Sequence, residues 1–306
     1  MRLSGASGNL VTPSDATING VTVGRGGGDV LGNTANGYQS LLSNTTGFSN
    51  TANGYQSLFS NTTGGSNTAL GESSLYSNTI GNYNTANGSQ ALYYNISGTN
   101  NTANGFQTLT NNTTGNHNTA VGDSALYSNT TGFSNTANGY LALYSNTTGY
   151  FNTANGRSAL QSNISGDSNT ANGYSSLYSN TTGYNNTANG FFTLYANTTG
   201  VSNTANGPYA LLSNTTGTSN TANGYAALTS STTGNGNVSL GNYAGSDITT
   251  GSFNIAIGNN AQVASPTSSN QLSIGNWIYG TSGNIGIGTS TGTARFTVAG
   301  TVKIAD

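Results

Sequence analysis

The sequence predicts an all-β fold, a parallel β-solenoid or β-roll made of 17-residue coils. The first observation is a repeat: the unit Asn-Thr-Ala-Asn-Gly, or a close variant, occurs fourteen times in phase between Asn33 and Asn254, without an insertion or deletion. The second is glycine at two fixed places in each copy. The third is the absence of an apolar helical period in a chain rich in β-branched and aromatic residues. A repeat of this kind indicates one structural unit per copy, stacked on its neighbours.

Two glycine positions divide each coil. Counting the first Asn of a copy as position 1, glycine occupies position 5 in all fourteen copies (Gly37 to Gly258) and position 15 in thirteen (Gly47 to Gly251). A glycine at fixed phase marks a backbone corner that needs a positive φ or a close approach of neighbouring chain. Two corners leave two straight segments, and each is expected to form a short strand.

The apolar positions predict which side chains face inward. Position 9 is Leu in all twelve regular copies, from Leu41 to Leu228, and position 3 is Ala in the same copies. Position 4 is usually Asn but becomes Leu70 and Val121, so we expect it to be at least partly buried in a ladder of stacked amides. An exposed face of Thr and Asn side chains at positions 2 and 4 is the competing interpretation.

One Leu per coil is a thin core. A fully buried Leu contributes about 1.5–3 kcal/mol, whereas ordering each backbone residue costs about 1–2 kcal/mol. Burying a side face against identical chains would add to the core. We therefore expect the chain to be its own partner in a homo-oligomer, most simply a homotrimer.

Four segments are expected along the chain. Residues 1–32 form an N-terminal cap or lead-in that contains a strand–turn–strand pattern, and residues 33–236 hold twelve regular coils. Residues 237–288 hold divergent, more apolar repeats, and residues 289–306 form a C-terminal strand, the stub of a further domain.

Composition excludes several function classes. Only 4% of the residues are charged, and the net charge is −2, so neither a nucleic-acid interface nor binding to an anionic membrane is expected. No apolar run reaches the length of a membrane span, and no signal peptide is visible. The chain has no Cys and one His, His117, so no metal site and no cofactor is expected. The segment from Gly24 to Asp29 lacks the Lys-Ser/Thr pair of a phosphate loop and is interpreted as a capping turn.

The repeat from Asn118 to Gly132 resembles repeats of bacteriophage tail-fibre proteins, and it is similar to the head repeats of trimeric autotransporter adhesins. The C-terminal run from Gly283 to Ser290 also looks like the segment before the intramolecular chaperone of many tail fibres. The resemblance covers nearly the whole chain and implies a left-handed, homotrimeric β-roll in a virion tail or on a cell surface or outside the cell. The chain departs from the adhesin pattern in carrying Asn at position 4 in ten copies.

Two sets of surface residues could carry function. Ten Asn residues at position 12, from Asn44 to Asn214, stand in Asn-x-Ser/Thr sequons, and turn chemistry is favoured over glycosylation as the reason. Tyr or Phe recurs at positions 6 and 10, where packing between chains competes with stacking on sugars. The candidate glycan-binding strip is the densest aromatic run: Tyr140, Tyr144, Tyr150, Phe151, Tyr174, Tyr178 and Tyr184.

The sequence therefore predicts a structural fibre shaft with an adhesive role toward a host receptor or surface glycan. An ice-binding solenoid is an alternative, because Thr recurs at positions 2, 13 and 14. A self-assembling extracellular filament, whose open ends stack coil on coil, is another. No catalytic group of residues is visible, and an enzyme is not expected.

Overall fold

The computed structural model describes residues 15–18, 21–281, 284–287 and 296–298. It divides into two units, unit 1 (Met1–Thr148) and unit 2 (Gly149–Asp306). Both are built of β-solenoid coils that repeat every 17 residues, as predicted.

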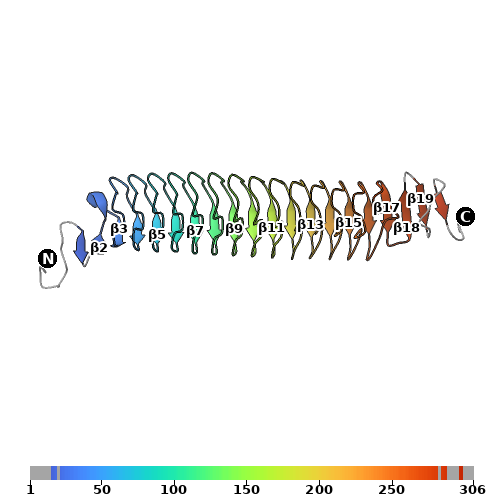
Figure 1. The fold of residues 1–306 in the computed structure, drawn as a ribbon, viewed down its shortest axis with the longest axis horizontal. Coiled ribbons are helices and arrows are strands. Elements are labelled where there is room, and N and C mark those ends of the chain that lie inside the picture. Colours follow the sequence, from blue (N-terminus) through green and yellow to red (C-terminus); the bar gives the residue numbers. More distant parts are fainter. Residues whose placement is uncertain (1–14, 19–20, 282–283, 288–295, 299–306) are drawn as a thin grey trace, which may run out of the picture. The chain divides into compact units, whose positions relative to one another are not determined.

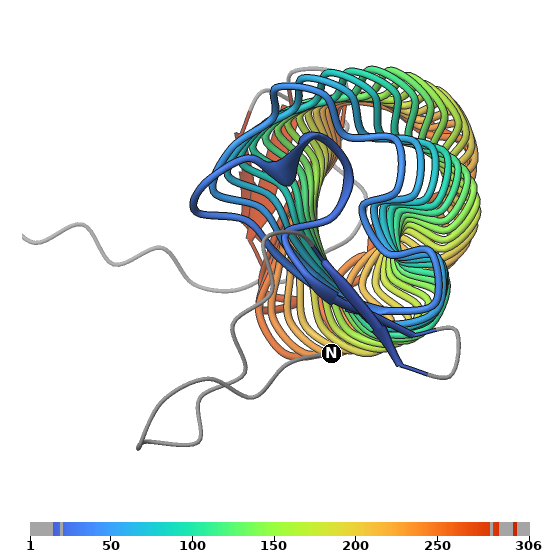
Figure 2. The same ribbon diagram turned by 90° about the vertical axis from the view of Figure 1, so that its left-hand side faces the viewer.

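From Thr34 to Asn138, unit 1 is a ladder of parallel strands in perfect register. Thr34 pairs with Thr51 and Ala35 with Ala52, and the same pairing continues through the unit. Figure 1 shows the strands side by side, and Figure 2 shows the blue to green coils one behind another. The elements are β1 (Ala16–Ile18), β2 (Val21–Gly24), the 3₁₀ turn η1 (Gly27–Asp29), β3 (Thr34–Gly37), β4 (Thr51–Asn53), β5 (Thr68–Leu70), β6 (Thr85–Asn87), β7 (Thr102–Asn104), β8 (Thr119–Val121) and β9 (Thr136–Asn138).

Unit 2 continues the same pattern and then changes. Strands β10 to β17 are parallel, β18 is antiparallel to both β17 and β19, and β20 is parallel to β19. Gln271 takes the place of Asn at position 1, so β17 is one coil more than the fourteen copies visible in the sequence. The strands are β10 (Thr153–Asn155), β11 (Thr170–Asn172), β12 (Thr187–Asn189), β13 (Thr204–Asn206), β14 (Thr221–Asn223), β15 (Val238–Leu240), β16 (Ile255–Ile257), β17 (Gln271–Ile274), β18 (Ile278–Thr281), β19 (Asn284–Ile287) and β20 (Phe296–Val298).

Each regular coil holds one short strand, so the prediction of two strands per coil is wrong. The rest of the coil turns repeatedly, because positions 7, 9 and 17 have left-handed backbone with positive φ. These turns still bond to the neighbouring coil: the Leu58 N–H donates to the Ser74 carbonyl at 3.0 Å, and the Ser60 N–H donates to the Tyr76 carbonyl at 3.0 Å. Backbone groups are thus paired between coils without a second regular strand.

The Leu at position 9 is the core residue, as predicted. All twelve are fully buried, and their φ angles lie between 49° and 53°. A left-handed conformation costs a non-glycine residue about 1–2 kcal/mol, which is comparable to the gain of about 1.5–3 kcal/mol from burying the side chain. Leu alone therefore cannot hold the coil together.

Two ladders of buried Asn supply the rest of the interior. At position 12 in unit 1, each Asn from Asn61 to Asn146 donates from Nδ2 to Oδ1 of the Asn one coil before it, at 2.7–2.9 Å. In unit 2, Asn180, Asn197 and Asn214 make the same bond at 2.8 Å. At position 1, the Asn50 Oδ1 accepts from the Asn67 backbone N–H at 3.0 Å, and this bond repeats in later coils. A stacked amide thus satisfies its donor and acceptor inside the protein.

The two ladders meet at the glycine of position 15. The Gly64 carbonyl accepts from Asn50 Nδ2 at 2.8 Å and from Asn61 Nδ2 at 2.9 Å. A Cβ on Gly64 would lie 2.5 Å from Asn61 Oδ1 and 2.4 Å from the Gly81 carbonyl oxygen. Glycine is required here by close approach, whereas at position 5 it is required by a φ of 123–150° as well. Both reasons were anticipated from the glycine pattern.

Position 4 faces outward, away from the core, although its Asn side chains are half-buried in the coils from Asn155 to Asn206. Ala at position 3 points inward with at most 1% of its surface exposed from Ala35 to Ala222. Because neighbouring side chains in a strand alternate between faces, positions 2 and 4 then point away from the core. Leu70 is 36% exposed and Val121 is 37% exposed. The competing interpretation, an exposed face of Thr and Asn, is the one that the single chain shows.

The N-terminal segment covers the first coil of unit 1. Strand β2 is antiparallel to β3, and the Gly27 N–H donates to the Leu41 carbonyl at 2.9 Å. Asn44, at the start of the position-12 ladder, donates from Nδ2 to the Gly27 carbonyl at 3.2 Å. A Cβ on Gly27 would lie 2.3 Å from the Leu42 carbonyl oxygen. The glycines of the Gly24–Asp29 run therefore let this segment lie directly on the coil and bond to it.

We predict that Leu143→Ala lowers the free energy of unfolding by about 2–5 kcal/mol, because it removes a fully buried side chain and leaves a cavity. The matched control is Leu42→Ala at position 10, where the side chain is 48% exposed. Chemical denaturation followed by circular dichroism measures both. An equal loss for the two variants would contradict the assignment of position 9 as the core.

We predict that Asn112→Ala is as damaging as the loss of a core Leu. The variant removes the Nδ2 donor to Asn95 Oδ1 and the acceptor of Asn129 Nδ2, and each orphaned buried group costs about 1–3 kcal/mol. Thr114→Ala, at an exposed position of the same coil, is the control. Unfolding curves that superimpose for the two variants would show that the amide ladder contributes nothing.

Candidate functional site: an aromatic surface

The aromatic residues of positions 6 and 10 form rows of stacked rings. In unit 1, the rings of Tyr38 and Tyr55 lie 5.3 Å apart, and those of Tyr76 and Tyr93 lie 4.9 Å apart with planes 6° from parallel. In unit 2, the Tyr178 and Tyr195 rings lie 5.1 Å apart. The solenoid places the same position of adjacent coils about 4.8 Å apart, so rings at one position stack face to face.

The seven residues of the predicted strip fall on both sides of the division between the units. In unit 1, Tyr140 is 45% exposed, and Tyr144 stacks on Tyr127 at 5.2 Å. In unit 2, Tyr150 and Phe151 form an edge-to-face pair at 5.3 Å, and Tyr184 is 45% exposed. Tyr174 and Tyr178 belong to a larger group of rings in the same unit.

That larger group depends on position 7, which sequence reasoning did not single out. Phe192 and Tyr209 are at position 7 of consecutive coils, and both lie beside the position-6 ring of Phe191. The Phe192 ring is 5.4 Å from that of Tyr174 and 5.0 Å from that of Tyr195. The signal was present in the sequence, because no other two consecutive coils carry rings at position 7.

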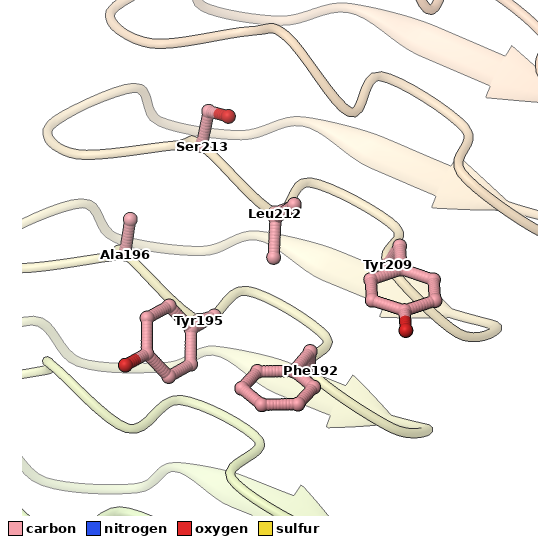
Figure 3. A pocket seen from close by; sticks show the side chains of 6 residues that line it. All are labelled: Phe192, Tyr195, Ala196, Tyr209, Leu212 and Ser213. Carbon is pink, nitrogen blue, oxygen red and sulfur yellow. The ribbon is translucent and has the colours of Figure 1, made fainter.

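Phe192, Tyr195 and Tyr209 line an open groove of ≈ 500 Å³ in unit 2 (Figure 3). The Phe192 and Tyr209 rings lie 6.2 Å apart and only 3° from parallel. Leu212 points into the space between Tyr195 and these two rings (Figure 3). The lining residues are Phe192, Tyr195, Ala196, Tyr209, Leu212 and Ser213.

A second groove, of ≈ 410 Å³, lies in unit 1. Its lining is mostly hydroxyl and amide side chains of positions 11 and 13, with one ring and one aliphatic side chain: Ser77, Tyr94, Ile96, Asn111, Thr113, Ser128 and Thr130. The Thr113 and Thr130 hydroxyls already donate to carbonyl groups of the next coil, at 3.0 Å each. These two Thr hydroxyls are therefore already used in hydrogen bonds between coils.

The Asn residues of the sequons are likewise part of the hydrogen-bond network between coils. Asn61 and nearly all of its counterparts at position 12 are fully buried, and their amides form the ladder described above. An amide nitrogen that is buried and hydrogen-bonded is not accessible for glycosylation in the folded chain. Turn and ladder chemistry therefore accounts for this position.

Charged groups are few among the residues that the structure describes. Arg25 pairs with Asp29 at 3.1 Å in the exposed N-terminal segment, and His117, Glu72 and Asp123 lie at exposed positions. Within the described ranges, no group of three or more metal-ligating side chains occurs. Arg157 lies beside the aromatic surface of unit 2, with its guanidinium carbon 5.8 Å from the Tyr174 ring centroid.

Comparison with known proteins gives no family. No family model, no curated protein and no solved structure matches the chain. In the part of the chain that the structure describes, no helix has the length and apolar character needed to cross a lipid bilayer.

Two side chains near the end of the regular coils, Tyr243 and Asp247, have raised pKa values. A hydrogen bond with Tyr225, together with the charge of that neighbour, raises the pKa of the Tyr243 phenol. Burial raises the pKa of Asp247, while backbone amides of Asp247, Val263 and Ile248 act in the opposite direction. The Asp247 Oδ1 atom is buried without a hydrogen-bond partner. Ionisation of Asp247 is therefore less favourable in the folded chain than in the unfolded one.

We predict that Asp247→Asn stabilises unit 2 at neutral pH. Because the folded pKa lies above the ordinary value of 3.8, the parent loses stability as pH rises through the raised pKa. The gain in the free energy of unfolding should be present at pH 7 and should vanish at a pH below 3.8, the ordinary pKa of the carboxyl group. Denaturant unfolding of parent and variant at both pH values measures it. Glu72→Gln controls for the removal of one negative charge, and a gain of the same size at low pH would contradict the prediction.

Proposed function

We propose that the chain is a structural fibre shaft with an adhesive role, of the kind found in bacteriophage tail fibres and cell-surface adhesins. On this proposal it acts as a homotrimer of left-handed β-rolls, in a virion tail or at the outer surface of a cell. Its partners are its own copies and a host receptor or surface glycan. Its role is mechanical and adhesive rather than catalytic.

The observation that carries the proposal is the division of labour between positions of the repeat. The inward positions, with Leu, Ala and two Asn ladders, are nearly invariant because every coil needs them to bond to the next. Variation is concentrated at positions 6, 7, 10, 16 and 17, where most of the aromatic side chains lie. A scaffold that repeats without change, and whose surface alone differs between coils, suits a shaft that presents binding groups.

Trimer assembly is supported by the apolar side chains on the outward face of the strands. Leu240 and Ile255 are 38% and 39% exposed at positions 4 and 2 of unit 2, where earlier coils carry Asn and Thr. A single chain leaves this surface in water. Packing identical chains against it would remove apolar area from water, worth about 25 cal/mol per Å².

An ice-binding function is the second candidate, because the Thr residues of position 2 lie on the outward face of parallel, in-register strands. The Asn residues beside them count against it. Asn172 donates from Nδ2 to Asn189 Oδ1 at 2.7 Å, and Asn189 donates to Asn206 at 2.7 Å. Amides bonded to one another have fewer groups left for ordered water. Thermal hysteresis of a chain solution measures this activity directly.

A filament built by coil-on-coil stacking is less well supported. The backbone groups of the first coil in unit 1 already bond to the N-terminal segment, through β2 and Gly27. A second chain would have to displace that segment before it could stack on this edge.

We predict that the intact chain sediments as a trimer at micromolar concentration. Sedimentation equilibrium measures the mass, and circular dichroism of the same sample reports whether the chain is folded. A folded monomer that persists at this concentration would remove the trimer from the proposal.

The adhesive role is tested by binding of the fluorescently labelled intact chain to a panel of bacterial and animal cells. Saturable binding that excess unlabelled chain displaces is the expected result. Absence of binding to every cell type, with a folded sample, would leave the chain as a passive shaft.

A further inference from the structure

The groove at Phe192 and Tyr209 lies where the stacked row of rings at position 10 is interrupted. In the preceding coil, Tyr178 stacks on Tyr195 at 5.1 Å. After Tyr195 the position-10 row ends, because the next coil carries Leu212. One face of Tyr195 is covered by Tyr178, and its row offers no ring to cover the other. This interruption opens the groove.

The rings around the groove are held in place by perpendicular neighbours. Phe192 meets Phe191 edge to face at 4.5 Å and 83°, and Phe191 in turn meets Tyr209 at 5.5 Å and 81°. Tyr209 also meets Tyr225 at 5.7 Å and 77°. Edge-to-face packing fixes the orientation of a ring. A ligand would therefore meet preorganised rings and would not spend binding free energy on ordering them.

The surroundings of the groove carry no charge. No Asp, Glu, Lys, Arg or His occurs between Ser168 and Ser246, a run that includes the groove coils and the coils on either side of them. Arg157 lies against Tyr174, two coils before Phe192, a separation of about 10 Å along the coils. An anionic ligand would lose its hydration without gaining a charged partner, which is unfavourable. Charge complementarity thus favours a neutral ligand.

Size and chemistry favour a sugar over a protein. The volume of ≈ 500 Å³ lies within the range of about 300–1,000 Å³ typical of small-molecule sites. Six residues line the groove, whereas a stable protein interface takes about 20–30 residues from each side. The axial C–H groups of a pyranose carry slight positive charge and pack on the electron-rich face of an aromatic ring. Tyr195, Tyr209 and Ser213 line the groove, and their hydroxyls can form hydrogen bonds with the hydroxyls of a sugar.

We propose that this groove is a binding site for a neutral glycan, with Phe192, Tyr195 and Tyr209 as the stacking platforms and Leu212 as the apolar floor. The proposal rests on the adhesive function proposed above and names the ligand class and the site for it. It moves the binding site along unit 2, beyond Tyr174 and Tyr178, and away from the other residues of the strip predicted from sequence.

The test uses the intact chain and the double variant Phe192→Gln with Tyr209→Gln. Gln already occupies position 7 with left-handed backbone at Gln39, Gln56, Gln90 and Gln107, so the coil accepts this residue. The matched control is Tyr55→Ser, which removes a stacked ring from position 6 in unit 1, where Ser89 is a natural precedent. The probe is an array of neutral hexose and N-acetylhexosamine oligosaccharides, together with the same chains ending in sialic acid or sulfate.

The parent should bind one or more neutral oligosaccharides, and the double variant should bind them at least about tenfold more weakly, a change of about 1.4 kcal/mol. Tyr55→Ser should bind like the parent, and the sialylated or sulfated forms should bind no more tightly than the neutral ones. Undiminished binding by the double variant would place the site elsewhere, and tighter binding of anionic glycans would overturn the ligand class.

Two further measurements separate this inference from the proposed function. A smaller sedimenting mass for the double variant would show that the groove packs against another copy of the chain, which overturns the glycan site. Binding to cells without binding to any glycan on the array would overturn the inference and leave the adhesive function standing. Absence of binding both to cells and to the glycans of the array would overturn this inference and the adhesive function together.

Discussion

The fold depends on one interaction, the convergence of two buried Asn amides on the carbonyl group of a glycine in most of the regular coils. Gly64 receives Asn50 and Asn61 in this way, and each amide also bonds to a neighbouring coil. The rest follows from this geometry. Position 15 has no room for a side chain, the left-handed turns at positions 9 and 17 are tolerated because the amides and backbone bonds hold them, and Leu fills the space that remains.

The amide ladder also explains where the regular coils change character. In unit 2 the ladder of position 12 reaches Asn214, and the next two residues at that position are Ser231 and Ile248. Asn214 Oδ1 and Ser231 Oγ are both buried without a partner. Beyond this point Ile248 is fully buried, so the interior changes from hydrogen-bonded amide to hydrocarbon. A polar interior of this kind is stable only while every amide has its neighbour.

Sequence reasoning found the repeat, the solenoid and the inward Leu and Ala, because a large apolar residue and a small one that recur at fixed phase in every coil indicate an interior. It left the direction of position 4 open, because exchange of Asn for Leu or Val occurs on an outward strand face as well as in a core. It expected a second strand per coil, because left-handed Leu at position 9 has no signature in composition. The buried Asn ladders were visible only as invariant Asn, which is equally typical of turns. For the candidate site, the rows at positions 6 and 10 were predicted. The groove was missed: it combines the break in the position-10 row at Leu212 with two rings at position 7 of consecutive coils, a pair that the phase of the repeat could have indicated.

The perfect register of the ladders bears on how the length of such a chain can change during evolution. Each coil offers the same donors and acceptors to the coil before it and to the coil after it, so within a unit any Asn of position 12 can follow any other. Loss or duplication of one whole repeat would rejoin matching partners. A gain or loss of one residue would bring Asn against Gly or Thr and break the ladders at that coil. Selection on folding alone would therefore keep the repeat length constant while leaving the number of repeats free to vary.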